Sequence, residues 1–460
     1  MDKCFIDHAG IYDYLKNTTP PDAVELEEIL SHARGLKGIS FAEAERLLMV
    51  EDSDHLVRIA DMARFIKEEI YGRRLVLFAP LYFSNLCSND CLYCAFKKSN
   101  TAITRRTLTM DEVRREVQAL VQQGQKRILL LSGEGLGKNA LEYTVEALET
   151  IYSVKVGKGE IRRVNVNIAA LPVEGYRTLK AARIGTYQLF QETYHADTYK
   201  TMHPSGPKAN YLYHLTAMDR AMEAGIDDVG VGILFGLEDY RFEIMALLQH
   251  IRHLEERFGT GVHTISVPRL EPATGSDLSV HPPHPVSDRD FRKIISILRI
   301  TVPYTGMILS TREDAAMRHD ALSLGISQIS AGSRTNPGGY SESDSAEQFS
   351  LGDHRTLEEV IRDIATMGHI PSFCTGCYRL GRTGHDFMDL AKPGLIKQYC
   401  LPNALTSFKE YLVNYATPET RAIGHALIEK MLAEIPSDSL RAKTAESLDQ
   451  IEKGAVDIYV

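Results

Sequence analysis

The stretch Cys87-Ser88-Asn89-Asp90-Cys91-Leu92-Tyr93-Cys94 contains three of the seven cysteines of this 460-residue chain. It follows the apolar run Leu75–Pro80, which we expect to form a buried strand. Three thiolates at this spacing can bind three irons of a [4Fe–4S] cluster and leave the fourth iron without a protein ligand. That open iron can chelate a small molecule that carries an amine and a carboxylate. A zinc site would normally need four Cys or His ligands, and no histidine lies close to this stretch in the sequence.

The run before the cysteines is the first of eight short apolar stretches that alternate with helical patterns. Continuous apolar runs are typical of parallel strands buried on both faces, and eight βα units over about 260 residues fit a (β/α)8 barrel. We therefore predict an α/β fold with a (β/α)8 TIM-type barrel over residues 74–340. Strand counting leaves a doubly wound open sheet as the alternative. The expected strands are Leu75–Pro80, Arg127–Ser132, Val164–Ala169, Thr186–Gln191, Asp228–Phe235, Thr264–Leu270, Pro303–Ser310 and Ile326–Ala331.

Helical segments flank the predicted barrel on both sides. Residues 1–73 carry apolar positions at three-and-four spacing, which predicts an N-terminal helical segment that packs on the barrel. The polar loop Ser341–Ser345 is the expected boundary. Beyond it we predict a helical C-terminal domain over residues 341–460 that carries a second cysteine group.

This second group consists of Cys374, Cys377 and Cys400, a Cys-x2-Cys-x22-Cys set. Ligand chemistry alone leaves two candidates, an incompletely ligated iron–sulfur cluster and a structural zinc ion. Zinc would need a fourth ligand, for which three histidines lie nearby in the sequence: His354, His369 and His385. The remaining cysteine, Cys4, is given no role.

Charge and hydropathy narrow the class of protein further. The chain has 52 Lys and Arg against 61 Asp and Glu, and its net charge of −9 gives no electrostatic footprint for nucleic acid. Its longest apolar runs, such as Ile128–Leu131, are the length of strands and too short to span a membrane. No apolar core of signal-peptide length follows the first residues. We expect a cytoplasmic protein without nucleic-acid or membrane partners.

The first cysteine stretch resembles the motif of the radical S-adenosylmethionine (SAM) family. The likeness rests on the Cys-x3-Cys-x2-Cys spacing, on Tyr93 before the last cysteine, and on the position after strand one of a βα barrel. It implies that Cys87, Cys91 and Cys94 hold a [4Fe–4S] cluster that binds SAM through its amino and carboxylate groups. One electron then cleaves the sulfonium bond of SAM to give a 5′-deoxyadenosyl radical.

The same resemblance implies SAM contacts at the ends of later strands. Glu134, in the turn after strand two, corresponds to the family motif that holds the SAM amine. Gln191 and Glu192, at the end of strand four, are expected at the SAM ribose or amine. Relatives read Glu-x-Gly-Glu-Asp around the second-strand motif, where this chain has Leu131 and Gly135 in place of the two outer acids.

The tail narrows the resemblance to the HydG family of [FeFe]-hydrogenase maturases, which are radical SAM tyrosine lyases. The segments that carry it are Phe373–Arg379, Gly381–Gly384, Cys400–Ala404, Gln191–His195, His203–Lys208, His263–Arg269 and Ser330–Ser333. The likeness implies cleavage of the Cα–Cβ bond of L-tyrosine to p-cresol and dehydroglycine. Dehydroglycine would then become carbon monoxide and cyanide on an iron at a second, auxiliary iron–sulfur cluster, for assembly of the hydrogenase active site.

The resemblance also implies metal ligands in the tail. Cys374, Cys377 and Cys400 would hold the auxiliary cluster, and an extra iron there would be bound by free cysteine and by His263. His263 precedes strand six, so we expect it at the bottom face of the barrel, away from the SAM site. A tail that covers this face would bring the three cysteines close to His263.

Residues for a tyrosine substrate are expected at the carboxyl ends of the strands, where βα barrels carry their functional groups. The substrate carboxylate needs a cation, and Arg312 at the end of strand seven is the candidate. Ser330 and Ser333 at the end of strand eight could add hydroxyl donors. Together with Glu134 and Glu192, these residues would form the mouth of the barrel.

The resemblance implies partners as well, namely a reductant such as ferredoxin or flavodoxin and other hydrogenase maturation proteins. The alternatives are a 2-iminoacetate synthase of thiamine biosynthesis, a paralogue that acts on a different amino acid and, outside the enzymes, an iron–sulfur scaffold or carrier. The tail cysteines with His263 argue against the thiamine enzyme. Glu134, Glu192 and Arg312 at the mouth argue against a pure carrier, which would not need them.

Overall fold

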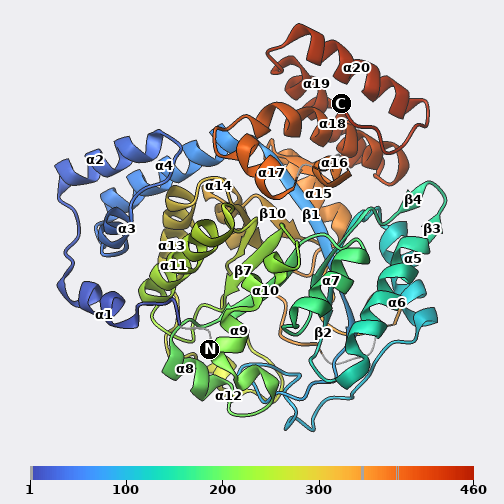
Figure 1. The fold of residues 1–460 in the computed structure, drawn as a ribbon. Helices are drawn as coiled ribbons and strands as arrows, with labels where there is room; N and C mark the ends of the chain where they lie inside the picture. Colours follow the sequence, from blue (N-terminus) through green and yellow to red (C-terminus); the bar gives the residue numbers. More distant parts are fainter. Residues whose placement is uncertain (1–3, 343–346, 380, 382) are drawn as a thin grey trace.

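The computed structural model describes residues 4–342, 347–379, 381 and 383–460, and a closed barrel of eight parallel strands lies at its centre (Figure 1). β1 pairs with β2 along one edge and with β10 along the other, which closes the sheet on itself. Closure confirms the predicted barrel and excludes the open doubly wound sheet. The barrel strands are β1 (Arg74–Ser84), β2 (Arg127–Ser132), β5 (Arg163–Asn167), β6 (Tyr187–Glu192), β7 (Val229–Ile233), β8 (Thr264–Ser266), β9 (Gly306–Leu309) and β10 (Gln328–Ser330).

Helices form the outer ring of the barrel, as the alternating pattern predicted. At the start of α5, Thr109 and Glu112 form a capping box that satisfies N–H groups of the first helical turn. The ring consists of α5 (Met110–Gln122), α6 (Ala140–Ser153), α7 (Val173–Ala181), α10 (Ala217–Glu223), α11 (Tyr240–Phe258), α13 (Asp288–Thr301) and α14 (Ala315–Leu324). The longer connections contain α8 (Ala196–Met202), α9 (Tyr211–Leu215), α12 (Asp277–Val280) and two 3-10 turns, Gly137–Asn139 and Pro207–Ala209.

The N-terminal segment is helical, as its apolar spacing predicted. Its helices are α1 (His8–Asn17), α2 (Ala23–Arg34), α3 (Phe41–Leu48) and α4 (Ser53–Tyr71). α4 packs against α13 and α14 and buries Ile59, Ile66 and Ile70. This contact makes α4 part of the barrel's helical shell.

The tail lies at the end of the barrel where the strands begin (Figure 1). Its helices are α15 (Leu357–Thr366), α16 (Gly376–Arg379), α17 (Gly384–Ala391), α18 (Ile396–Asn414), α19 (Pro418–Ala433) and α20 (Asp438–Glu452). Ser343–Ser345 of the expected boundary loop lie outside the described residues, as does Arg382 of the tail motif. The division at residue 340 therefore stays a prediction.

Two small β elements were not predicted from the sequence. β11 (Ile370–Ser372) pairs in parallel with the start of β1, with Arg74 opposite Ile370, so the tail adds a ninth strand to the sheet. It is three residues long with Pro371 in its middle, and proline, which cannot donate a backbone hydrogen bond to a neighbouring strand, lowers the strand signal of a sequence. β3 (Lys155–Val156) and β4 (Gly159–Glu160) form a separate short hairpin.

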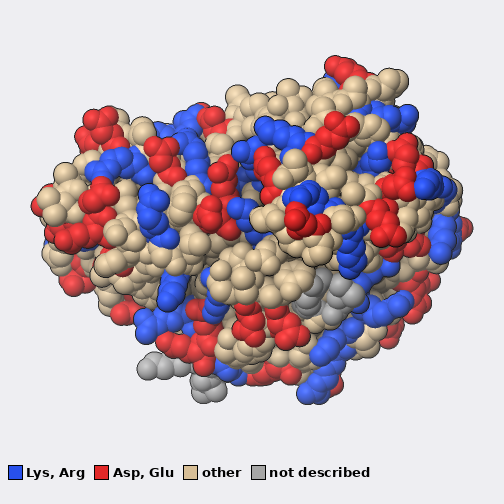
Figure 2. All heavy atoms as spheres, turned by 90° about the horizontal axis from the view of Figure 1, so that it is seen from above, with Lys and Arg blue, Asp and Glu red and all other residues tan. Residues whose placement is uncertain are grey.

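Charges of both signs are interspersed over the face seen from above in Figure 2. Surface charges of the chain also form ion pairs, such as that of Arg362 with Glu419 at 2.8 Å. In the part of the chain that the structure describes, no helix combines the length and apolarity that crossing a membrane requires.

Glu410 on α18 anchors the tail to the barrel through a buried group of charges. Arg162 donates to both carboxylate oxygens, at 2.9 Å and 2.6 Å, and Lys126 Nζ lies 3.3 Å from Oε1. All three side chains are at most 5% exposed. Burial alone would raise the pKa of Glu410, but Arg162 and Lys126 hold that pKa below its usual value. The helix that carries Cys400 is thus held by an ion pair that water screens little.

Replacing the anchor tests its contribution to stability. Glu410→Gln should lower the free energy of unfolding by about 3–5 kcal/mol, because buried Lys126 loses its counter-charge and Arg162 retains only Asp457, 3.2 Å from its Nε. The matched control is Glu419→Gln at the surface pair with Arg362, which should cost less than about 1 kcal/mol. Urea denaturation followed by circular dichroism measures both, and equal losses in the two variants would contradict the anchoring role.

Candidate active site and tail cysteine site

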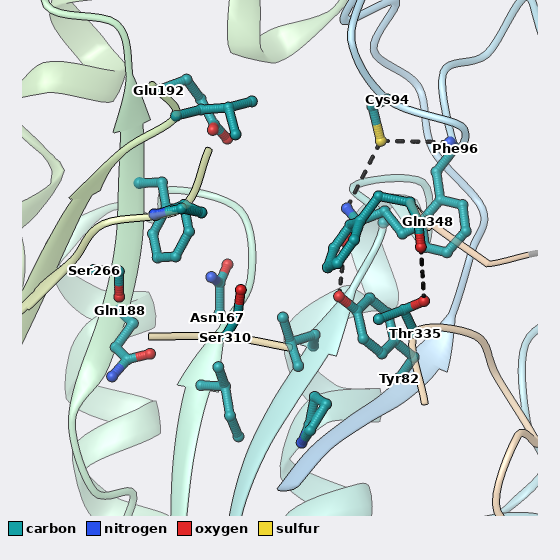
Figure 3. Close-up of a pocket in the computed structure, with 18 of the residues that line it drawn as sticks. Tyr82, Cys94, Phe96, Asn167, Gln188, Glu192, Ser266, Ser310, Thr335 and Gln348 are labelled. Carbon is teal, nitrogen blue, oxygen red and sulfur yellow. Dashed lines mark hydrogen bonds between the residues drawn. The ribbon is translucent and has the colours of Figure 1, made fainter. Parts of the chain in front are cut away.

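A cavity at the carboxyl ends of the barrel strands contains the first cysteine group (Figure 3). Cys87, Cys91 and Cys94, in the loop after β1, form part of its wall. The charged residues of the lining are Glu134, Glu192, Lys208 and Arg312. Three of these four were predicted at separate strand ends, and the structure brings them to one cavity with the cysteines.

The cysteine loop packs tightly on the turn after β2. Asn89 Nδ2 donates to the Glu134 carboxylate at 2.7 Å. A Cβ atom added at Gly133 would lie 2.3 Å from the Leu86 carbonyl oxygen, and one added at Gly135 would lie 2.5 Å from the Leu86 carbonyl carbon. The two glycines therefore permit a backbone approach that any side chain would prevent. Gly135 is part of this contact.

Cys91 of the first group is buried, Cys87 and Cys94 are partly buried, and the Cys94 thiol receives N–H donors. Cys94 Sγ accepts from the Phe96 N–H at 3.4 Å and from Gln348 Nε2 at 3.7 Å, while Gln348 Oε1 accepts from the Tyr82 hydroxyl at 2.7 Å (Figure 3). Burial raises the pKa of Cys87 and raises that of Cys94 to about 11. These thiols are therefore protonated unless a metal binds them. N–H donors to sulfur are a feature of cluster-binding cysteines, so the donor set fits an iron–sulfur cluster.

Glu192 is aimed into the cavity by an irregularity in β6. Its φ of 68° lies in the left-handed region, and the pairing of β6 with β7 shifts register between Phe190 and Glu192. Lys208 Nζ donates to Glu192 Oε1 at 2.7 Å, and the Lys208 N–H donates to Asn89 Oδ1 at 2.9 Å. Burial opposes the charge of Lys208, but Glu192 raises the pKa of this lysine well above its usual value. Sequence reasoning left Lys208 on a loop without a role.

Tyr93 lies in the cavity wall, whereas Gln191 does not. His203 Nδ1 is 2.8 Å from the Tyr199 carbonyl oxygen and so carries the proton, which leaves Nε2 to accept from the Tyr93 hydroxyl at 2.8 Å. Tyr93 is thereby held in one orientation next to the cysteines. Gln191 instead lines a separate small cavity together with His250.

Of the residues predicted for the substrate, Arg312 and Ser330 reach the cavity and Ser333 does not. The Arg312 Cζ atom stacks 3.3 Å from the centroid of the Phe349 ring. Burial lowers the pKa of Arg312, and among the described residues no carboxylate lies within ion-pair distance of it. This cation is thus available to an anionic ligand. Ser333 is buried outside the lining.

A polar floor, which sequence reasoning missed, lies deeper in the cavity (Figure 3). It is formed by Asn167 on β5, Gln188 on β6, Ser266 on β8 and Ser310 after β9. The apolar walls around it are Phe78, Leu129, Leu131, Phe190 and Ile308. The signal was present in the sequence, because each floor residue interrupts or ends an apolar run. A ligand with an apolar body and a polar tip would match this arrangement.

A second cavity, at the end of the barrel where the strands begin, is lined by all three tail cysteines and by His263. Cys374 follows β11, Cys377 lies on α16 and Cys400 lies on α18, while His263 comes directly before β8. The structure therefore brings together four residues from four separate segments, as the position of His263 before its strand predicted. The three histidines considered as further zinc ligands, His354, His369 and His385, do not line this cavity.

The tail cavity is cationic. Arg74 and Arg127 belong to its lining, and no Asp or Glu of the described chain does. Arg127 Nη1 donates to the Cys374 carbonyl at 2.9 Å, and the Gly376 N–H donates to Cys374 Sγ at 3.3 Å. Guanidinium groups and N–H donors would offset the negative charge of thiolates that bind a cluster.

The spacing of the ligating atoms distinguishes a cluster from a single metal ion. Over the described ranges, no three His, Cys, Asp or Glu side chains gather at a point that one ion could occupy. The thiolates of a four-iron cluster each bind a different iron and need not converge. Three cysteines in each group are therefore compatible with three thiolates that bind different irons of one cluster.

Comparisons with known proteins agree with this geometry. A sequence model of the radical SAM superfamily matches residues 81–251, and one of the biotin and thiamin synthesis associated domain matches residues 266–370. The 2-iminoacetate synthase of Salmonella typhimurium is 32% identical over 351 residues, which are 76% of this chain and 89% of that protein.

Solved structures of HydG, a maturase of the [FeFe]-hydrogenase, are similar over nearly the whole chain. One is 51% identical, covers 99% of this chain and 100% of its own, and superposes with a TM-score of 0.96. That of Carboxydothermus hydrogenoformans is 39% identical, with coverage of 96% and 97% and a TM-score of 0.84.

The glycine contact behind the cysteine loop can be tested directly. Gly135→Ala should displace the loop, because its Cβ would meet backbone atoms of Leu86 and Cys87 at 2.5–2.6 Å. We expect the variant to lose most of the iron of the first group while it retains that of the tail, measured as iron and sulfide per chain after anaerobic reconstitution. The control is Gly137→Asn, where nothing lies within 4 Å and the positive φ suits asparagine. Full iron content in Gly135→Ala would show that the loop tolerates the displacement.

Proposed function

Because this chain belongs to the radical SAM superfamily, we propose that it is a carbon–carbon lyase of [FeFe]-hydrogenase maturation. It would cleave the Cα–Cβ bond of L-tyrosine to p-cresol and dehydroglycine, and then form carbon monoxide and cyanide at the tail site. One observation carries the proposal: cysteine groups stand at both ends of one barrel, in a chain 51% identical to a HydG structure over 99% of its length.

The mouth of the barrel would hold the SAM-binding cluster and SAM. Cys87, Cys91 and Cys94 would ligate the [4Fe–4S] cluster, which together with SAM supplies the radical that starts the reaction. Glu134 would accept hydrogen bonds from the SAM amine, and Glu192 offers a second acid for the cationic cofactor. Since Asn89 binds Glu134 and Lys208 binds Glu192, both carboxylates are oriented before SAM arrives.

The remainder of the cavity suits an aromatic amino acid. Arg312 would bind the tyrosine carboxylate, and the Ser330 hydroxyl could donate to the same group. The apolar walls would hold the ring, while the floor formed by Asn167, Gln188, Ser266 and Ser310 would bind the phenolic hydroxyl. Enclosure within the barrel would exclude water from a reactive intermediate.

The tail site would take the two-carbon fragment. Cys374, Cys377 and Cys400 would ligate an auxiliary cluster, and His263 would bind an extra iron that also carries free cysteine. Arg74 and Arg127 would balance the charge of the thiolates and of an anionic cyanide product. A ferredoxin or flavodoxin would serve as reductant, and other hydrogenase maturation proteins would receive the product.

A second candidate function is that of a 2-iminoacetate synthase, favoured by the 32% identity over 89% of the Salmonella typhimurium enzyme. It would use the mouth cavity in the same way and release the two-carbon fragment without further change. A paralogue that cleaves another amino acid and an iron–sulfur carrier are the remaining possibilities. The hydrogenase maturation lyase, the 2-iminoacetate synthase and the paralogue would each form different products, and the carrier would form none.

The products distinguish these functions in one experiment. The full chain is reconstituted anaerobically with iron and sulfide and given SAM, a reductant and tyrosine. We expect deoxyadenosine, p-cresol, carbon monoxide and cyanide. p-Cresol without carbon monoxide would favour the 2-iminoacetate synthase, deoxyadenosine without p-cresol would reject tyrosine as the substrate, and the absence of all products would favour the carrier.

The tail cysteines are tested by replacing two of them together. Cys374→Ser with Cys377→Ser should abolish carbon monoxide and cyanide, because serine is a poor ligand for the auxiliary cluster, while p-cresol formation continues at the mouth. Gas chromatography and cyanide derivatisation measure the products. Loss of p-cresol as well would assign the tail a structural role.

The substrate role of Arg312 predicts a specific kinetic change. Arg312→Gln should raise the KM for tyrosine by about 10–100-fold, since a charge-assisted hydrogen bond contributes about 1.5–3 kcal/mol. The matched control is Arg292→Gln at the surface pair with Asp320, which should leave the KM unchanged. An unchanged KM in Arg312→Gln would place the carboxylate elsewhere.

A further inference from the structure

The two ring nitrogens of His263 lie in different surroundings. Nδ1 is 2.8 Å from Asp228 Oδ1, whereas Nε2 is 3.2 Å from the Tyr378 hydroxyl. Tyr378 and His263 line the cavity with the tail cysteines, and Asp228 does not. The ring therefore turns one nitrogen toward a buried carboxylate and the other toward the cavity.

The topology of the barrel sets up this contact. Asp228 directly precedes β7 and His263 directly precedes β8, and these neighbouring strands pair in parallel. The His263 N–H donates to the Val229 carbonyl at 2.8 Å, which fixes the backbone next to Asp228. Asp228 is only 2% exposed, so its carboxylate interacts with protein groups and hardly with water.

Arg163 lies on the other side of this carboxylate. Its Nη2 lies 3.5 Å from Asp228 Oδ2, and its Cζ stacks 3.2 Å from the centroid of the Tyr378 ring. The guanidinium thus favours an ionised Asp228 whose Oδ1 remains for His263. The same guanidinium stacks on the ring of Tyr378, whose hydroxyl lies near His263 Nε2.

We propose that Asp228 is a positioning residue that makes His263 a ligand for ferrous iron through Nε2. By accepting the Nδ1 proton, Asp228 fixes the tautomer in which the Nε2 lone pair points into the tail cavity. The pairing of a carboxylate with the second nitrogen of a metal-binding histidine is a general feature of metal sites. The Tyr378 hydroxyl competes with iron for the same lone pair. The inference rests on the proposed function of the tail as a metal site.

Asp228→Asn is the informative substitution because it retains the size of the side chain. Arg163 would attract the amide oxygen, and the amide NH2 would then turn toward His263. The imidazole would have to accept at Nδ1 and carry its proton on Nε2, which blocks the ligating atom. Asp227→Asn is the matched control, since Asp227 is the exposed neighbour and accepts from Thr383 Oγ1 at 2.9 Å.

The experiment measures iron binding and the tautomer in the full chain. After reconstitution with iron and sulfide, ferrous iron is titrated against a competing chelator in the wild type, His263→Ala, Asp228→Asn and Asp227→Asn. We expect Asp228→Asn to weaken the His263-dependent affinity by about 10–100-fold and Asp227→Asn to leave it unchanged. NMR of 15N-histidine-labelled chain, with the His263 signal identified from His263→Ala, should show the proton on Nδ1 in the wild type and on Nε2 in Asp228→Asn.

The outcomes separate this inference from the proposed function. Equal iron affinity in the wild type and His263→Ala would reject His263 as a ligand, and with it the proposed tail site. A His263-dependent affinity that Asp228→Asn leaves intact would overturn the role of Asp228 alone. Weakened affinity with an unchanged tautomer would also overturn it, because Asp228 would then act only on the stability of the region.

Discussion

The pairing of β1 with three other strands is the constraint on which both cysteine sites depend. β2 and β10 pair along its two edges and close the barrel, and β11 extends the sheet at its start. The carboxyl end of β1 leads into the loop with Cys87, and the strand paired with its amino end leads into Cys374. One buried strand thus positions a cysteine group at each end of the molecule, and any shift in its register would displace both.

The two ends differ in electrostatics in a way that matches their proposed ligands. The mouth combines two carboxylates, Glu134 and Glu192, with the cations Lys208 and Arg312, which suits zwitterionic molecules such as SAM and an amino acid. The tail cavity presents guanidinium groups and an imidazole but no carboxylate in its described lining, which suits thiolates and anions. A buried carboxylate, Asp228, stays behind the imidazole, where it can orient His263 without adding charge to the cavity.

The barrel and the cysteine groups could be predicted because their signals are local. Eight apolar runs mark the strands, and cysteine spacing marks the ligands. β11 could not be predicted, since three residues with a central proline form a strand only because the edge of β1 is available. Lys208 was missed because its burial depends on contacts with Asn89 and Glu192 from distant loops.

Gln191 was predicted at the SAM site, and its actual position shows a second limit of prediction from the sequence. Neighbouring residues on a strand point to opposite faces, so Gln191 and Glu192 do not both face the cavity in a regular strand. The alternation of side chains along a strand could have shown that only one of the two residues faces the cavity. The register shift before Glu192, however, was not visible in the sequence. His263 was placed correctly at the barrel bottom from its position before β8, whereas its contact with Asp228 required the three-dimensional pairing of two strand starts.

The central claim is that one barrel supports two independent iron–sulfur sites, one at each end. The most direct test counts iron and sulfide per reconstituted chain in the wild type, in a variant with Cys87, Cys91 and Cys94 replaced by alanine, and in one with Cys374, Cys377 and Cys400 replaced. The account predicts about eight cluster irons in the wild type and one more where the His263 site is filled. It predicts a loss of about four irons without the first group, and of four or five without the tail group. Full iron content after the loss of either group, or complete loss of iron after removal of one, would contradict it.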